Sequence, residues 1–120
     1  IYELLSSGYK PIVAHIERYK CMKDIELVEY LVNKGAYMQV NADSVIGKNG
    51  HGVKKYCGKL LEDELVQFIG SDCHGSKRRV TRIGDAYAYV SKKFGRQAAD
   101  EIFIDNPQEI LDNAKHCLLL

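Results

Sequence analysis

The chain has 120 residues, of which 17 are basic and 16 acidic, so its formal net charge at pH 7 is +1. This balance argues against a nucleic-acid-binding surface and against a polybasic membrane anchor. No apolar run approaches the roughly 20 residues needed to cross a bilayer, and no signal peptide is visible, so we expect no membrane insertion and a cytoplasmic protein. The hydrophobic fraction of 46% is typical of one globular domain, here spanning 1–120.

The first residues predict that the natural protein extends upstream. The chain opens on Ile1 rather than Met, and the apolar positions of 1–5 follow a helical period until Gly8. That pattern is typical of the last turns of a helix that ends at a glycine. We therefore treat 1–120 as a fragment of a longer chain.

Strands and helices alternate along the rest of the sequence. Asp24 is expected to cap a helix that Gly35 ends, and Asn106 is expected to cap the last helix, with Pro107 in its first turn. The predicted strands are 11–14, 36–40 and 65–70; the predicted helices are 24–34, 44–46, 53–63, 82–94, 96–101 and 106–116. This order predicts an α/β fold with parallel strands and right-handed crossovers. Three strands with helices on one side fit a slice of a barrel better than a complete open sheet.

Ligand-type side chains follow two of the predicted strands. Asp72 and His74 are two residues apart, so on an extended strand both point the same way. His15 follows the first strand, and the ends of neighbouring parallel strands meet in one cleft. A carboxylate with imidazoles suits Mn²⁺, Fe or Zn²⁺. Because each segment alone is a weak pattern, a hydrogen-bonded packing histidine and an exposed strand-end pair remain the alternatives.

Arginines lie close to both segments, as phosphate binding requires. Arg18 comes three residues after His15, and Lys77, Arg78 and Arg79 follow His74. Guanidinium groups bind phosphate oxygens in a bidentate manner, and metal ions beside them supply the hydroxide for phosphoryl hydrolysis. A solvated basic loop is the alternative for 77–79. His51 and His116 have no visible partners and are expected at the surface.

The four cysteines, at 21, 57, 73 and 117, match neither a CxxC zinc pattern nor a compact disulfide framework, which predicts reduced thiols. Cys73 and Arg79 do form the Cys-x5-Arg spacing of cysteine-dependent tyrosine phosphatases. The carboxylate of Asp72 opposes ionisation of the neighbouring thiol, and strand alternation turns Cys73 away from the predicted ligands. We therefore disfavour a cysteine nucleophile.

These segments together resemble the manganese-dependent tyrosine phosphatases of bacterial capsular and exopolysaccharide synthesis, which belong to the polymerase and histidinol phosphatase (PHP) superfamily. The segment 8–19, GYKPIVAHIERY, is similar to the family's G-Y-x-P-I-L-A-H-P-E-R-Y. The likeness continues in order through Gln39–Ala42 with Ile46-Gly47, Ser71–His74 and Asn106-Pro107. It covers essentially the whole chain, and the ordered set is more specific than any one motif.

The resemblance implies a distorted (β/α)7 barrel whose C-terminal half is this chain, with a metal cluster at the strand ends. It implies Mn²⁺, with Fe, Zn²⁺ or Mg²⁺ as alternatives, held in part by His15, Asp72 and His74. Arg18 and Arg79 match arginines that hold the substrate phosphate. The implied activity is hydrolysis of phosphotyrosine on the tail of a cytoplasmic tyrosine kinase that controls polysaccharide chain length.

The sequence departs from the family pattern in two ways, which affect the backbone of His15 and the metal binding expected of the fragment. The family proline after the histidine is Ile16 here, which relaxes the backbone restraint on His15. The family's N-terminal H-x-H, its next histidine and its glutamate ligands are absent, so the isolated fragment should bind metal weakly and show little activity. Exposed apolar surface from the barrel interior favours a homo-oligomer or dependence on the missing chain. The alternatives are a phosphatase of small phosphomonoesters, such as histidinol phosphate, and an inert binding module.

Overall fold

The computed structural model describes residues 6–71, 81–112 and 117–119 of the chain. Its strands are β1 (Lys10–Val13), β2 (Tyr37–Asn41), β3 (Phe68–Gly70) and β4 (Cys117–Leu119). Its α-helices are α2 (Ile25–Asn33), α3 (Ala42–Ile46), α4 (His51–Glu62), α5 (Thr81–Phe94), α6 (Arg96–Asp100) and α7 (Asn106–Asp112). Two 3-10 turns, η1 (Ile16–Arg18) and η2 (Lys20–Lys23), and one π-helical segment, η4 (Glu101–Asp105), complete the described elements. No described helix has the length and apolar character required of a membrane span.

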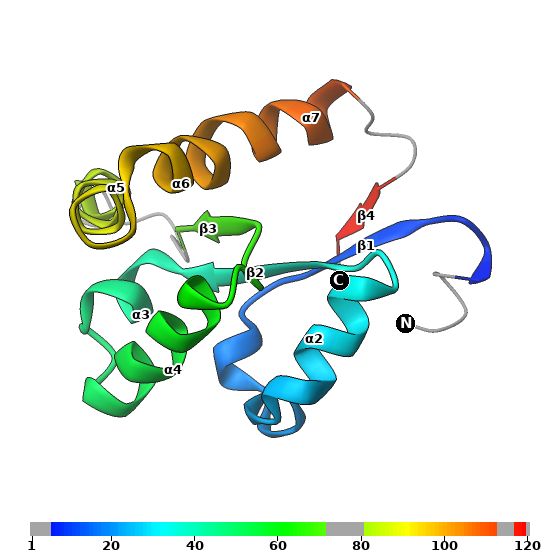
Figure 1. The fold of residues 1–120 in the computed structure, drawn as a ribbon, viewed down its shortest axis with the longest axis horizontal. Helices are drawn as coiled ribbons and strands as arrows, with labels where there is room; N and C mark the ends of the chain where they lie inside the picture. Colours follow the sequence, from blue (N-terminus) through cyan, green and yellow to red (C-terminus); the bar gives the residue numbers. More distant parts are fainter. Residues whose placement is uncertain (1–5, 72–80, 113–116, 120) are drawn as a thin grey trace.

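The four strands form one parallel sheet in the order β3-β2-β1-β4 (Figure 1). In the register, Val13 of β1 lies beside Met38 of β2, and Val40 of β2 lies beside Ile69 of β3. The prediction of parallel strands is therefore confirmed. Because all strands run the same way, the carboxyl ends of β1, β2 and β3 lie along one edge of the sheet.

The arrangement of helices differs from the expected barrel slice. Figure 1 shows α2 and α4 on one side of the sheet, with α6 and α7 running across the other. The strand order explains this difference. The crossovers from β1 to β2 and from β2 to β3 move in one direction, whereas the connection from β3 to β4 returns past β1. Right-handed crossovers in opposite directions place their helices on opposite faces.

The fourth strand was not predicted. The last helix was expected to run to about residue 116, with no strand after it. In the structure, β4 pairs with β1: Lys10 lies beside Cys117, and Ile12 lies beside Leu119. The run 117–120 is apolar but too short to be distinguished from a helix end by its period. Its pairing with β1, about a hundred residues earlier, is a long-range contact that local sequence does not encode.

The core forms where α2 and α4 pack on β2. Met38 and Val40 of β2 are fully buried, as are Val28 of α2 and Leu60 of α4. The helix boundaries follow the predicted signals: the Asp24 side chain accepts a hydrogen bond from the backbone N–H of Glu26 at 3.0 Å. Burial of these apolar side chains, at about 25 cal/mol per Å², is the main stabilising contribution to this layer.

The last helical region corrects one predicted boundary. Asn106 does not begin a separate helix, because the π-helical segment η4 joins α6 to α7 and Asn106 has helical backbone angles. Its side chain donates a hydrogen bond to the carbonyl oxygen of Gln67 at 2.8 Å instead of capping α7. Pro107 lacks a backbone N–H and its ring crowds the preceding turn, which the wider π turn accommodates.

Candidate functional site at the strand ends

The candidate site lies where β1, β2 and β3 end side by side. His15 comes two residues after β1, Asn41 is the last residue of β2, and Ser71 directly follows β3. In parallel α/β proteins this edge is where ligands bind, because the loops and helix starts that follow the strands converge there. The structure thus brings the first predicted ligand to the expected edge of the sheet.

His15 has an unusual backbone and a fixed ring. Its φ and ψ are 57° and 42°, in the left-handed region that non-glycine residues seldom adopt. Ile16 follows it in place of a proline, so the backbone of His15 is not confined to the extended region. The half-buried ring is hydrogen-bonded through Nδ1 to Oδ1 of Asn41 at 2.6 Å. Since an amide oxygen only accepts, Nδ1 donates in this hydrogen bond.

Asn41 links the ends of β1 and β2 through two hydrogen bonds. Besides its side-chain contact with His15, its backbone N–H donates to Oε2 of Glu17 at 2.9 Å. Both side chains are buried, with exposed fractions of 1% for Asn41 and 8% for Glu17. Within the described ranges, Nδ2 of Asn41 and Oε1 of Glu17 are buried without a hydrogen-bond partner. Buried polar atoms without a hydrogen-bond partner are rare in protein interiors, so two of them next to His15 indicate that this part of the core is unusually polar.

Sequence reasoning missed these two supporting residues. Asn41 and Glu17 lie in the family-like segments 39–42 and 8–19, for which the sequence predicted no role of either side chain. A signal was available in principle, because a metal-binding imidazole usually donates its other N–H to an oxygen acceptor. What the sequence could not supply was the pairing of β1 with β2 that brings Asn41 to His15.

The remaining predicted site residues are only partly tested. Arg18 is exposed at the end of η1, and its backbone N–H donates to the carbonyl oxygen of His15 at 3.0 Å. Asp72, His74 and Arg79 lie outside the described residues. In the described ranges, no three His, Cys, Asp or Glu side chains form a group that could hold a metal. The whole predicted ligand set, His15 included, therefore stays a prediction.

An ion pair unforeseen from the sequence joins the helices that flank the site. Nη1 of Arg82, in the first turn of α5, lies 2.7 Å from Oδ2 of Asp43, in the first turn of α3. Their side chains are 34% and 21% exposed. Because α3 follows β2 and α5 follows the segment after β3, the pair ties together two elements that begin at the same edge of the sheet.

The buried cysteine of α4 provides no activated nucleophile. Cys57 is fully buried in α4, and burial, with the nearby carboxylate of Glu17, raises the pKa of its thiol to about 12. Cys21 is exposed and carries a free thiol. Both agree with the prediction of reduced thiols. Cys73 and Cys117, the other two, are not among the residues whose side chains are described.

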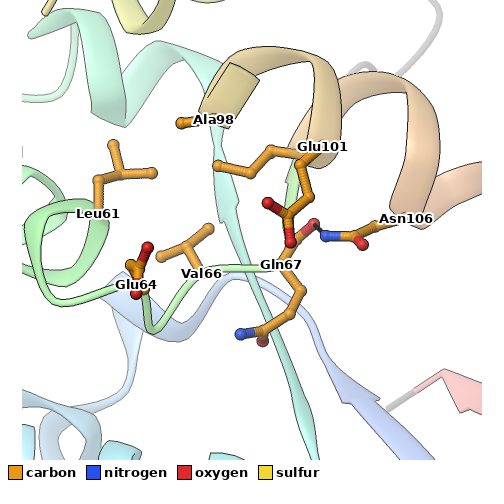
Figure 2. Close-up of a pocket in the computed structure, with 8 residues that line it drawn as sticks. Leu61, Glu64, Val66, Gln67, Ala98, Glu101 and Asn106 are labelled. Carbon is orange, nitrogen blue, oxygen red and sulfur yellow. Dashed lines mark hydrogen bonds between the residues drawn. The ribbon is translucent and has the colours of Figure 1, made fainter. Parts of the chain in front are cut away.

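Two cavities differ in their relation to this edge. A mostly apolar cavity of about 420 Å³ adjoins η1 and the start of α4, and is lined by Glu17, Lys23, Gly52, Val53 and Tyr56. A second cavity, of about 290 Å³, lies between the start of β3 and the α6–η4–α7 region (Figure 2). In Figure 2, Glu64 and Glu101 lie on either side of Val66. This second cavity is at the amino end of β3, away from the candidate site.

Comparison with known proteins identifies the family. The family described as capsular polysaccharide synthesis, CpsB/CapC, matches residues 1–112. This chain belongs to the CpsB/CapC family. The chain is 34% identical over 116 residues to tyrosine-protein phosphatase CpsB of Streptococcus agalactiae, covering 92% of this chain and 48% of that protein. It is 34% identical over 97 residues to tyrosine-protein phosphatase YwqE of Bacillus subtilis, covering 80% of this chain and 38% of that protein.

A solved structure supports the same relationship. The matching chain comes from the crystal structures of YwqE from Bacillus subtilis and CpsB from Streptococcus pneumoniae, described as unique metal-dependent tyrosine phosphatases. It superposes with a TM-score of 0.70 at 31% identity, covering 95% of this CpsB/CapC chain and 43% of that chain. The chain thus spans about half the length of the curated relatives it matches. The family resemblance drawn from the sequence motifs is confirmed.

Proposed function

We propose that the complete protein containing this chain is a metal-dependent protein tyrosine phosphatase of capsular or exopolysaccharide synthesis. Family membership and the names of the relatives support this proposal. The observation in this structure that carries it is the hydrogen bond from Nδ1 of His15, which follows β1, to Oδ1 of Asn41 at the end of β2. A hydrogen bond to the second ring nitrogen orients an imidazole, which is how proteins prepare a histidine for a metal.

The donor types of the predicted ligands, two imidazoles and a carboxylate, suit a metal site. His15 would bind a metal through Nε2, and the neighbouring predicted ligands, Asp72 and His74, would complete this half of the coordination sphere. Mn²⁺ is the proposed metal, since carboxylate and imidazole ligands suit it. Bound divalent ions polarise a phosphoryl oxygen and lower the pKa of water, which is the chemistry that phosphomonoester hydrolysis needs.

The other residues of the chain act on the substrate and on the histidine. Arg18 is proposed to bind the substrate phosphate, because it is the exposed last residue of the 3-10 turn that follows His15 and guanidinium groups bind phosphate oxygens in a bidentate manner. Arg79 is proposed as a second phosphate ligand. Asn41 holds the ring of His15, and Glu17 fixes the backbone of Asn41, so both are positioning residues rather than catalytic ones.

Further parts of the proposal concern the whole protein. We propose that 1–120 is a single-domain fragment contributing the C-terminal half of a (β/α)7 barrel, and that further ligands come from the other half. The isolated chain should then bind metal weakly and turn over little substrate. The proposed substrate is the phosphotyrosine tail of a cytoplasmic tyrosine kinase, and the reaction would take place in the cytoplasm. Self-association of the fragment also remains a prediction.

The test measures hydrolysis of a phosphotyrosine peptide by the complete gene product with added Mn²⁺, with EDTA and with iodoacetamide. We expect activity that requires Mn²⁺, disappears with EDTA and is unaffected by iodoacetamide. His15→Ala should lower activity at limiting Mn²⁺, whereas His51→Ala, at an exposed position of α4, is the matched control. Activity that resists EDTA and is lost with iodoacetamide would refute the proposal in favour of a cysteine nucleophile. Turnover of histidinol phosphate in preference to the peptide would reassign the substrate.

A further inference from the structure

A basic groove lies between α4 and α5, on the helical surface rather than at the strand ends. It is defined here by Lys54, Lys55 and Lys59 of α4 and Lys93 of α5, around a cavity of about 540 Å³. The residues that complete its lining are His51, Gly58, Glu62, Tyr89 and Phe94. In a chain whose net charge is only +1, a groove lined by four lysines is a local concentration of positive charge.

Aromatic side chains hold two of these lysines in place. Nζ of Lys54 lies 4.9 Å from the centroid of the Tyr89 ring, and Nζ of Lys93 lies 5.7 Å from the same centroid. Lys93 also donates a hydrogen bond to Oη of Tyr89 at 3.2 Å and lies 5.6 Å from the ring centroid of Phe94. Cation–π attraction to an aromatic face therefore gathers ammonium groups from two helices around one ring.

The positive charge of the groove is only partly compensated. Lys59 is near Asp63, with 3.4 Å between Nζ and Oδ2, and Glu62 is the one carboxylate among the lining residues. Among the residues that the structure describes, no carboxylate pairs with Lys54, Lys55 or Lys93. Ammonium groups that outnumber the carboxylates around them repel one another, and an anion bound between them would relieve that repulsion.

The middle of the groove is open at the backbone of α4. Gly58 lies there, and a Cβ built on it would meet no atom within 4 Å. Glycine inside a helix is unfavourable relative to alanine, so its presence costs stability while leaving space between the lysines. A ligand can therefore approach the helix backbone between Lys54 and Lys59.

We propose that this basic groove binds an acidic, extended segment of a partner polypeptide. The helix α4 has 12 residues and is about 18 Å long, a length that about five or six extended residues would cover. Carboxylates spaced along such a segment would form ion pairs with the lysine ammonium groups, and its apolar atoms would contact Tyr89 and Phe94. The proposal goes beyond the phosphatase activity, because none of these groove residues belongs to the strand-end site.

An acidic peptide fits better than a nucleic acid. The described lining contains no arginine, the residue best suited to bidentate phosphate contacts. The sequence pI of about 7.8 is below the basic values typical of nucleic-acid-binding domains. The groove is also short, whereas binding along a nucleic-acid backbone requires a continuous basic tract. Nucleic acids and anionic membranes are accordingly competing outcomes of the test.

The experiment measures binding to the complete gene product by fluorescence anisotropy. The probe is a labelled peptide of about ten residues rich in glutamate, compared with the same peptide carrying glutamine at those positions. The test variant is Lys54→Glu with Lys93→Glu. The control is Lys34→Glu, which alters a lysine of comparable setting, 5.5 Å from the Tyr30 ring centroid but outside the groove. Gly58→Leu provides a second test, because it fills the groove without changing its charge.

We expect the glutamate peptide to bind more tightly than the glutamine peptide, and the double variant to weaken that binding by about tenfold or more. Gly58→Leu should weaken it as well, whereas Lys34→Glu should change it by less than about twofold. Equal binding of both peptides, or equal losses in Lys34→Glu and in the double variant, would overturn the proposal. Tighter binding of a single-stranded oligonucleotide or of phosphatidylserine vesicles would also overturn it.

Discussion

Replacing Asn41 by leucine separates the role of this residue in metal binding from its role in stability. The substitution keeps the number and branching of the side-chain heavy atoms, adds the bulk of two methyl groups and removes the hydrogen bond to Nδ1 of His15, which is 2.6 Å long. Leaving a partly buried donor without its acceptor costs about 1–3 kcal/mol, and added bulk at a buried position costs a similar amount. The substitution also removes the buried, unpartnered Nδ2, which partly offsets the loss. The backbone hydrogen bond from Asn41 to Glu17 does not depend on the side chain. The free energy of unfolding should therefore fall by about 1–3 kcal/mol.

Metal affinity should fall as well as stability. Without Asn41, the ring of His15 loses the hydrogen bond that orients it and that favours the proton on Nδ1, so its Nε2 is less well positioned for a metal. Loss of such a supporting hydrogen bond typically lowers metal affinity about 10- to 100-fold. We expect this loss in Mn²⁺ titrations of the complete protein, with activity partly restored by excess Mn²⁺.

Ser44→Ala is the matched control for Asn41→Leu. Ser44 is also fully buried near the end of β2, but its hydroxyl accepts a hydrogen bond from Nδ2 of Asn49 at 2.9 Å and does not contact His15. It should cost about 1 kcal/mol of stability with Mn²⁺ affinity unchanged. If Asn41→Leu leaves Mn²⁺ affinity within about twofold of the wild type, or if Ser44→Ala lowers it equally, Asn41 does not position His15 for a metal.

Three further predictions concern the described part of the chain. A double-mutant cycle in urea on Arg82→Ala and Asp43→Ala should give a coupling free energy of about 0.5–1 kcal/mol, and additive effects would show that the ion pair contributes nothing. Iodoacetamide at pH 8 should modify Cys21 but not Cys57 in the native protein, as read by peptide mass spectrometry; equal rates would contradict the burial of Cys57. The pKa of Cys57 and that of Tyr56 are both raised by burial to about 12, from 9.0 and 10.0. The folded state therefore retains these protons more tightly, so stability should be full below pH 9 and fall as the pH rises towards 12; a constant urea midpoint across that range would refute this assignment.

The sequence predicted elements well where the signal is local and repeated. The helical period and the Asp24 cap placed α2 to within one residue at each end, since burial of Val28 and Leu31 imposes that period. The strand before residue 70 was predicted too long: β3 contains only 68–70, although Leu65 and Val66 are buried. An apolar run predicts that its residues are buried, but it does not predict which of them pair with a neighbouring strand.

The place of His15 at a strand end was predictable, but its supporting contacts were not. His15 could be placed at a strand end because an apolar run precedes it. Its partner Asn41 is 26 residues away, and the partner of Asp43 is 39 residues away. Both contacts depend on the strand order and on which helix starts share an edge of the sheet. Those are properties of the assembled sheet, so no local pattern in the sequence encodes them.

The geometry at the strand ends also bears on how the two halves of the site would cooperate. The orientation of His15 is fixed by Asn41 and Glu17, and all three lie within the described part of this chain. The entropy of ordering this proposed ligand is therefore lost when the chain folds, and not when a metal binds. A single oriented imidazole would provide only a small part of the coordination free energy, so the proposal requires further ligands for tight binding. Preorganisation of His15 and the contribution of those further ligands are thus separable. The Asn41→Leu variant alters the first of them and leaves the second unchanged.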